Sequence, residues 1–258
     1  MLTKYATLFA VLAVLGWFAA GSDPAEGSPN GQTPEPRRPV LLELFTSEGC
    51  SSCPPADRLL ETLDRTQPVS GADLIVLSED VDYWNRLGWT DPYSSPLLAE
   101  RQQEYARRLH LDGAYTPQLV IDGQADFVGS DERAVRAGIL RAEAHPKTVV
   151  TLHAERAGPD VKVSLQVGDR TRQADLYLVL ANDPAQSQVT RGENSGRTLR
   201  HVAVVRSLVR VGTVPARDSF AKELAIPLKT DHSQSWRAVA FLQDAASGQI
   251  LGASETRF

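Results

Sequence analysis

An apolar run followed at once by a cysteine pair and two prolines is the feature that most constrains this chain. The run Val40 to Phe45 is typical of a buried strand, and the pair Cys50 and Cys53 follows it, directly before Pro54-Pro55. Proline is tolerated in the first turn of a helix, because the N–H that it lacks would have no partner there. The order therefore predicts a strand, a tight turn, two thiols and a helix start. Backbone N–H donors at that helix start favour a thiolate.

The first residues predict export. One lysine precedes a largely apolar stretch, residues 6–20, and small residues at 19–22 offer a cleavage site. This pattern is typical of a secretory signal peptide, predicted here for residues 1–21. The stretch is shorter than the roughly 20 residues that span a bilayer, and an uncleaved anchor is the alternative. The mature chain is expected to be periplasmic or secreted, without membrane association, in an oxidising compartment where a cysteine pair persists as a disulfide.

The composition is that of a globular protein. Hydrophobic residues make up 42% of the chain, and the formal net charge is -5. The mild acidity, without a long lysine or arginine run, gives no basis for binding nucleic acid or an anionic membrane. Residues 22–39 are mostly Pro, Gly and polar residues, and they predict a flexible linker. Folded structure is expected to begin near Val40.

Helix and strand patterns alternate after the cysteines, and Pro146 closes this part of the chain. The expected elements are an amphipathic helix at 56–65, a buried strand at 74–77, a helix from Ser95-Pro96 to about Leu109, a strand headed by Pro117, a return strand at 125–128 after the Asp122-Gly123 turn, and a helix capped by Ser130. The predicted order over residues 40–146 is β-α-β-α-β-β-α.

Beyond Pro146 the pattern becomes β-rich. Runs suited to strands lie at 149–154, 161–167, 174–181, 199–211, 220–228, 236–243 and 250–256. Short strands at this spacing predict an antiparallel sandwich-like domain at 147–258, with a recognition or scaffold role. His201 and Arg197, beside residues 192–196, either belong to a site facing the first domain or lie in a surface loop with a satisfied histidine.

Two motifs in this order resemble the thioredoxin fold. They are the C-x-x-C at a helix start and, later in the chain, the Thr-Pro before a strand and hairpin, and the resemblance covers about residues 40–144. The sequences of residues 43–57, 81–85 and 192–199 are similar to those of a secreted bacterial family of thioredoxin-like proteins, the domain of unknown function 1223. The fold class expected is an α/β thioredoxin-like domain followed by an all-β sandwich-like domain.

The resemblance implies roles for four residues. Cys50 would be the exposed nucleophile and Cys53 the more buried resolving thiol, with exchange through a mixed disulfide on Cys50. Pro117 matches the cis-proline of the superfamily, which would present the Thr116 backbone to a bound peptide. The expected function is thiol–disulfide exchange without a bound cofactor. The expected partners are protein thiols and disulfides of the cell envelope and an unidentified redox partner.

The chain departs from the superfamily pattern around the pair. Relatives carry a buried acid six residues before the first cysteine, where this chain has Leu44. A one-residue bulge would bring Glu43 into the role of proton acceptor for Cys53. Glu48 adds a carboxylate close to Cys50, which disfavours a thiolate, whereas helix-end donors favour it. The direction of electron flow therefore stays open.

Other uses of the pair remain. The disulfide could fix the binding loop of a non-catalytic binding module. A structural disulfide that closes so short a loop stabilises little by loop entropy. Two thiolates supply half of a tetrahedral zinc shell, and none of the five histidines stands at ligand spacing from the pair, so no metal site is predicted. A copper(I) chaperone using the two thiolates is the remaining alternative.

Aromatic residues gather between the motifs. Tyr83, Trp84 and Trp89 lie in a segment expected after the second strand, whose end approaches the C-x-x-C in a thioredoxin-like fold. They are candidates for lining a substrate groove. The alternative is that they cover the sheet as ordinary core residues, because aromatics dominate both settings.

Overall fold

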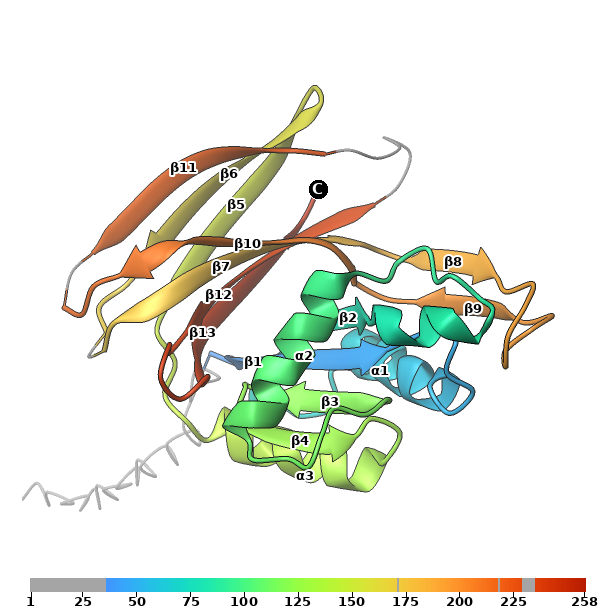
Figure 1. Ribbon diagram of the computed structural model, residues 1–258. Helices are drawn as coiled ribbons and strands as arrows, with labels where there is room; N and C mark the ends of the chain where they lie inside the picture. The colour runs from blue at the N-terminus through green and yellow to red at the C-terminus, as the bar shows by residue number, and fades with distance from the viewer. Residues whose placement is uncertain (1–35, 171, 218, 229–234) are drawn as a thin grey trace, which may run out of the picture. The chain divides into compact units, whose positions relative to one another are not determined.

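The apolar run before the cysteines forms strand β1, Arg38–Thr46, in the computed structural model of the protein (Figure 1). The structure describes residues 36–170, 172–217, 219–228 and 235–258. The predicted signal peptide and the linker up to residue 35 lie outside the described residues. Strand pairing begins two residues before Val40, and the Arg37 Nε donates to the carbonyl of Ala72 at 2.6 Å. The end of the predicted linker is therefore part of the folded structure.

The first half contains the helices and strands expected from local signals, together with a 3-10 helix that was not predicted. After β1 come α1 (Pro54–Thr66), β2 (Ala72–Asp80), the 3-10 helix η1 (Asp82–Leu87), α2 (Pro96–Arg108), β3 (Gln118–Ile121), β4 (Ala125–Val128) and α3 (Glu132–Glu143). Ser95 caps α2 by accepting a hydrogen bond from the Leu97 N–H at 3.3 Å. The predicted cap at Ser130 is wrong by one residue, since the Asp131 carboxylate accepts from the Ala134 N–H at 3.0 Å.

The second half consists of strands. They are β5 (Val150–Ala157), β6 (Asp160–Val167), β7 (Ala174–Asn182), β8 (Ala185–Gln188), β9 (Thr198–His201), β10 (Val204–Val214), β11 (Phe220–Pro227), β12 (Trp236–Gln243) and β13 (Ile250–Arg257). The run at 199–211, predicted as one strand, is broken between β9 and β10. Ala203 has a φ of 47° there, which a continuous strand does not allow. Strand β8 was not predicted.

One eight-stranded sheet runs through both halves. Its order is β13-β12-β7-β10-β2-β1-β3-β4, with β1 and β2 parallel and Val204 of β10 paired to Ser78 of β2. Helix α2 crosses one face of this sheet, and α1 and α3 lie on the other (Figure 1). Strands β11, β6 and β5 form a second sheet, and within the described part of the chain β8 pairs with β9 alone. The β8–β9 hairpin is thus outside the main sheet.

The hydrophobic cores follow this arrangement. The larger core combines residues of the first half, such as Leu44 and Leu60, with residues of the second, such as Val205 and Phe241. A second core lies between the three-stranded sheet and one face of β7 and β12. Residues 36–258 form one compact unit, and the boundary expected at residues 146 and 147 falls inside it.

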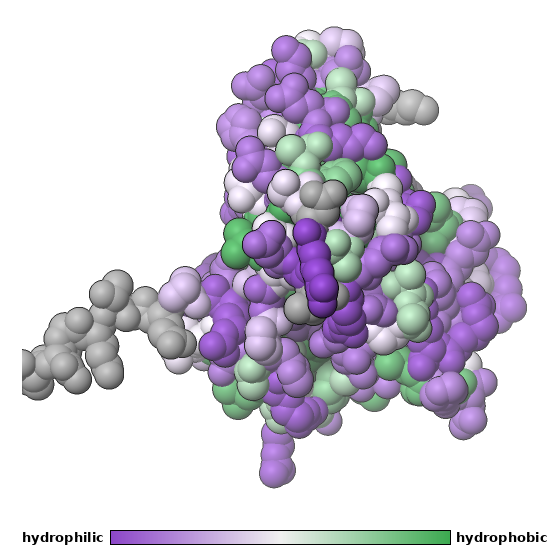
Figure 2. Space-filling view, turned by 90° about the vertical axis from the view of Figure 1, so that its left-hand side faces the viewer, coloured by the Kyte–Doolittle hydropathy of each residue, from purple (hydrophilic) through white to green (hydrophobic). Residues whose placement is uncertain are grey.

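The face drawn in Figure 2 is mainly hydrophilic, and hydrophobic residues lie there in small separate areas among hydrophilic ones. The described helices include none with the length and apolar character needed to cross a membrane.

Candidate functional site

The Cys50–Cys53 disulfide stands where β1 passes into α1. Its sulfurs are bonded, with the two Cα atoms 5.4 Å apart. The turn is held by the Cys50 N–H donating to the carbonyl of Ser47 at 3.1 Å. Cys53 is the residue before the first turn of α1, and its carbonyl accepts from the N–H groups of Ala56 and Asp57. The strand, turn and helix start predicted around the pair are confirmed.

Both cysteines are fully buried, each with 0% of its surface exposed. Ser51 and Ser52, between them, are exposed. The expectation that Cys50 is exposed is therefore wrong for this structure. The reason lies in the packing around the turn that holds the disulfide. A loop from far along the chain, residues 189–197 between β8 and β9, lies against this turn.

Asn194 makes the main contact of this loop with the cysteine turn. Its Nδ2 donates to the carbonyl of Glu48 and to the carbonyl of Cys50, each at 2.9 Å. The neighbouring Glu193 accepts from the Ser51 N–H at 3.1 Å. Asn194 is itself fully buried. The sequence analysis did not predict a role for Asn194, although residues 192–199 are one of the segments on which the family resemblance rests.

The carboxylate of Glu48 joins both strands of the hairpin to the cysteine turn. It accepts a hydrogen bond from the Ser187 hydroxyl of β8, and its Oε1 lies 3.4 Å from Nε2 of His201 of β9. The Trp89 indole N–H donates to its other oxygen at 2.9 Å. Burial raises the pKa of Glu48, but the contacts with His201, Ser187 and Trp89 outweigh it and leave the pKa below its ordinary value.

His201 lies in a buried group of acids beneath the pair. Its Nδ1 is 3.8 Å from Oδ1 of Asp57, which follows Cys53 by four residues on α1. Burial lowers the pKa of His201, yet the contact with Glu48 and the charges of Asp57 and Asp80 raise it to about 10. Burial raises the pKa of Asp57 to about 6. His201 thus faces the first half of the chain, the first of the two alternatives that the sequence left open.

Glu43 lies on the other side of β1 from α1. Leu44 approaches Ala56 of α1 across Gly129, and successive strand residues point to opposite faces. Glu43 accordingly meets α2, where it accepts from Arg101 Nε at 2.6 Å and from the Tyr105 hydroxyl at 2.5 Å. The expected bulge is absent, because β1 pairs with β2 in unbroken register from Arg38 to Thr46. The structure does not bring Glu43 to Cys53.

The Thr116-Pro117 motif lies near the start of α1. The peptide bond between the two residues is cis. A methyl group placed on Gly129 would lie 3.1 Å from Cβ of Ala56 and 3.3 Å from Cβ of Pro117, so this glycine separates the proline from the first turn of α1. The hydroxyl of Thr116 accepts from the Trp84 indole N–H at 2.9 Å.

The three predicted aromatic residues are half-buried and hydrogen-bonded inward. Trp84 joins Thr116 to the cysteine turn, since a Cβ on Gly49 would lie 3.0 Å from the Cβ of Trp84. The Tyr83 hydroxyl donates to Gln102 of α2 at 3.1 Å. Tyr83 and Trp84 also pack on a small core around Phe45. These side chains therefore lie between the cysteine turn and α2.

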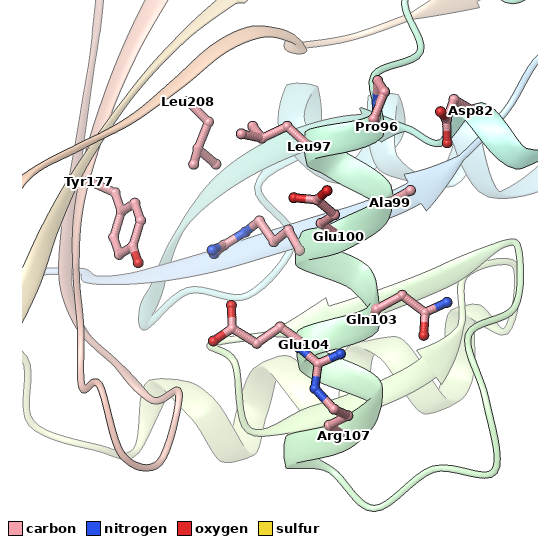
Figure 3. Close-up of a pocket in the computed structure, with 11 residues that line it drawn as sticks. Asp82, Pro96, Leu97, Ala99, Glu100, Gln103, Glu104, Arg107, Tyr177 and Leu208 are labelled. Atoms are coloured by element: carbon pink, nitrogen blue, oxygen red, sulfur yellow. The ribbon is translucent and has the colours of Figure 1, made fainter.

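Two large hollows lie away from the sulfurs. A cavity of about 1040 Å³ between α1, β8, β9 and the ends of β12 and β13 reaches His201. A groove of about 730 Å³ lies between α2 and strands β7 and β10. In Figure 3, Leu97 and Glu104 of α2 face Tyr177 and Leu208 across it. Sequence reasoning predicted neither hollow. The described residues contain no group of three or more His, Cys, Asp or Glu arranged to hold a metal ion.

Fold and site together define a mixed α/β protein with a C-x-x-C disulfide buried at a strand–helix junction. The chain belongs to the family described as a protein of unknown function, DUF1223, whose model matches residues 41–243. The crystal structure of the protein AGR_C_4864 from Agrobacterium tumefaciens is similar, with 28% identity and a TM-score of 0.66, covering 86% of this chain and 95% of that one.

Other likenesses are weak. The sporulation control protein Spo0M from Bacillus subtilis is 13% identical with a TM-score of 0.29, covering 44% of this chain and 49% of that chain. No curated protein matches the sequence.

Proposed function

We propose that this protein carries out thiol–disulfide exchange through Cys50 and Cys53, within a thioredoxin-like arrangement of residues 40–146. The observation that carries the proposal is the meeting of two motifs distant in the sequence. The disulfide stands at the start of α1, and Pro117 packs beside the first turn of the same helix across Gly129. The positive end of the helix dipole at that helix start favours the thiolate that exchange requires.

The reaction begins with attack of a substrate thiolate on Cys50. The Cys50–Cys53 bond breaks, a mixed disulfide forms on Cys50, and Cys53 leaves as a thiolate. A second thiolate of the substrate then attacks the mixed disulfide and releases Cys50. The substrate has gained a disulfide and given two electrons to the pair. A separate thiol–disulfide partner restores the pair by the reverse sequence, so exchange requires no bound cofactor.

The proposed location is the periplasm or the exterior of the cell. The support is the signal-like sequence at residues 1–21 and the disulfide itself, which persists in oxidising compartments. The proposed partners are proteins of the envelope that carry accessible thiols or disulfides.

A Cys53→Ser variant tests the proposal, because it retains Cys50, on which the mixed disulfide forms, and lacks Cys53, the thiol that resolves it. Incubated with envelope extract, it should accumulate mixed disulfides through Cys50, visible as bands that disappear on reduction. The Cys50→Ser, Cys53→Ser double variant is the control and should form none. A lack of trapped partners, together with a reduction potential below about -300 mV, would identify a structural disulfide instead.

The full burial of both cysteines favours a second candidate. In this alternative the protein is a non-catalytic binding module whose disulfide fixes the turn at residues 47–53. The double variant distinguishes the two, since a binding module without its disulfide should keep measurable affinity for a partner. An exchange protein should lose all covalent capture.

A further inference from the structure

The loop between β8 and β9 lies against the turn that holds the disulfide, on which the proposed function depends. We propose that this loop, residues 189–197, is a displaceable cover that gates access to the Cys50–Cys53 disulfide. The inference rests on the proposed function for its biological meaning, although the gating itself can be measured without it. Exchange requires in-line approach of a thiolate to a sulfur, and a fully buried sulfur denies that approach.

The cover is held at its tip by polar contacts. Asn194 donates two hydrogen bonds to carbonyls of the cysteine turn, and Glu193 accepts one from the Ser51 N–H. The other residues of the loop are exposed, apart from Val189 at its start. Few apolar contacts therefore oppose its release, and segments with few buried apolar contacts open at low free-energy cost.

Hydrogen bonds within the loop hold its residues together, so that the loop can move as one unit. The Val189 N–H donates to the carbonyl of Arg197 at 2.9 Å, and the Gly196 N–H donates back to Val189 at 2.8 Å. Within the loop, Arg197 also donates to the Asn194 side-chain oxygen at 3.0 Å. This bond orients the amide so that its N–H groups point to the cysteine turn. Displacing the loop leaves these internal contacts in place.

The hairpin can shift without loss of the main sheet. Strands β8 and β9 pair with each other and with no strand of the eight-stranded sheet among the described residues. They lie beside α1, on which β9 packs (Figure 1). A second attachment, at the base of the hairpin, is the Glu48 carboxylate, which is held by Ser187 and His201. The Asn194 tip can therefore open while this base stays attached.

The test measures how fast a small phosphine reduces the disulfide in the oxidised full chain. Tris(2-carboxyethyl)phosphine becomes its phosphine oxide, with oxygen from water, while the disulfide becomes two thiols. These thiols are alkylated and counted by mass spectrometry. If reduction occurs from the open state, the rate follows the population of that state.

An Asn194→Ala variant should be reduced roughly tenfold faster than the wild type, or more, because both hydrogen bonds to the cysteine turn are lost. Ser195→Ala is the matched control. Ser195 is exposed and its hydroxyl donates within the loop, to the carbonyl of Thr190. Its rate should stay within about threefold of the wild type, a spread below one typical hydrogen bond. Equal rates for the Asn194→Ala variant and the wild type would overturn the proposal.

Two further measurements keep the proposal testable if Asn194→Ala does not fold. Glu193→Ala removes an exposed anchor and should also accelerate reduction. In the wild type, amide hydrogen exchange should be faster in a peptide covering 189–197 than in peptides covering β1 and α1. The proposal would be overturned if amide hydrogen exchange at 189–197 were as slow as in β1 and α1. It would also be overturned if the disulfide of Glu193→Ala were reduced at the rate of the wild type.

The gating and the proposed function fail in different ways. If Asn194→Ala accelerates reduction but Cys53→Ser traps no protein, the cover stands and exchange as the function fails. If Cys53→Ser traps proteins and Asn194→Ala reacts like the wild type, the function stands and the cover fails.

Discussion

Replacing His201 with glutamine should remove a large pH dependence from the stability of the protein. The histidine is buried among the carboxylates of Glu48, Asp57 and Asp80, and its ring also meets the ring of Tyr93 at 5.9 Å. Burial opposes its positive charge, but the acids raise its pKa from 6.5 to about 10. A group whose pKa is raised by folding contributes its full stabilisation at pH values below its pKa in the unfolded chain. That stabilisation is lost as the pH rises to the pKa of the group in the folded protein.

The magnitude follows from the two pKa values. Each pKa unit corresponds to about 1.4 kcal/mol, so the rise at His201 corresponds to about 5 kcal/mol at low pH. The free energy of unfolding of the wild type, minus that of His201→Gln, should therefore fall by about 4 kcal/mol between pH 6.5 and pH 10, because the histidine is half titrated in the unfolded state at the first limit and in the folded state at the second. Asp57, with a pKa of about 6, titrates mainly below this window.

Urea unfolding of both oxidised proteins at half-unit steps of pH measures this difference. The pair forms the disulfide and no other cysteine is present, so alkaline thiol exchange within the chain does not interfere. A proton NMR titration gives a second readout, in which the histidine signal missing from His201→Gln should not shift below about pH 8. A difference in unfolding free energy that stays flat from pH 6.5 to pH 10 would refute the reasoning.

Two other changes test the packing and the charges around the site. Gly129→Ala should lower the free energy of urea unfolding by about 1–3 kcal/mol, because the new methyl would lie 2.7 Å from a Leu44 methyl. Gly113→Ala is the control: its new methyl would have no atom within 4 Å, and the loss should be less than about 0.5 kcal/mol. Arg101→Met should cost about 3–5 kcal/mol by leaving two buried glutamates without their cation, whereas Arg136→Met, from an exposed helix pair, should cost under about 1 kcal/mol. Equal losses within either pair of variants would contradict the assignment.

Local signals were enough to predict most elements. The Asp122-Gly123 pair has positive φ at both residues, 49° and 65°, as a tight hairpin turn requires, and the return strand 125–128 is confirmed as β4. Proline at the start of α1 and α2 marked both helices correctly. Such signals act within a few residues, so the sequence alone carries them.

The hairpin over the disulfide could not be predicted in the same way. Strand β8, Ala185–Gln188, has the sequence AQSQ, which lacks the apolar alternation that marks a strand. The loop at 189–197 is polar, and polar loops look alike wherever they lie. Asn194 reaches Cys50 across a sequence separation of 144 residues through one amide group. No pattern in the composition encodes a contact of that kind.

Glu48 shows why the reactivity of the pair cannot be judged from neighbours in the sequence. Two residues before Cys50, it is expected to disfavour a thiolate by its negative charge. In the folded protein its charge is balanced by His201 and its oxygens accept from Ser187 and Trp89. Release of the whole hairpin would remove both His201 and Ser187 and leave the carboxylate close to the sulfur without its cation. The hairpin that is proposed to gate the disulfide therefore also supplies, through His201, the positive charge that offsets the Glu48 carboxylate. Opening at the Asn194 tip alone would expose the sulfurs while keeping that charge.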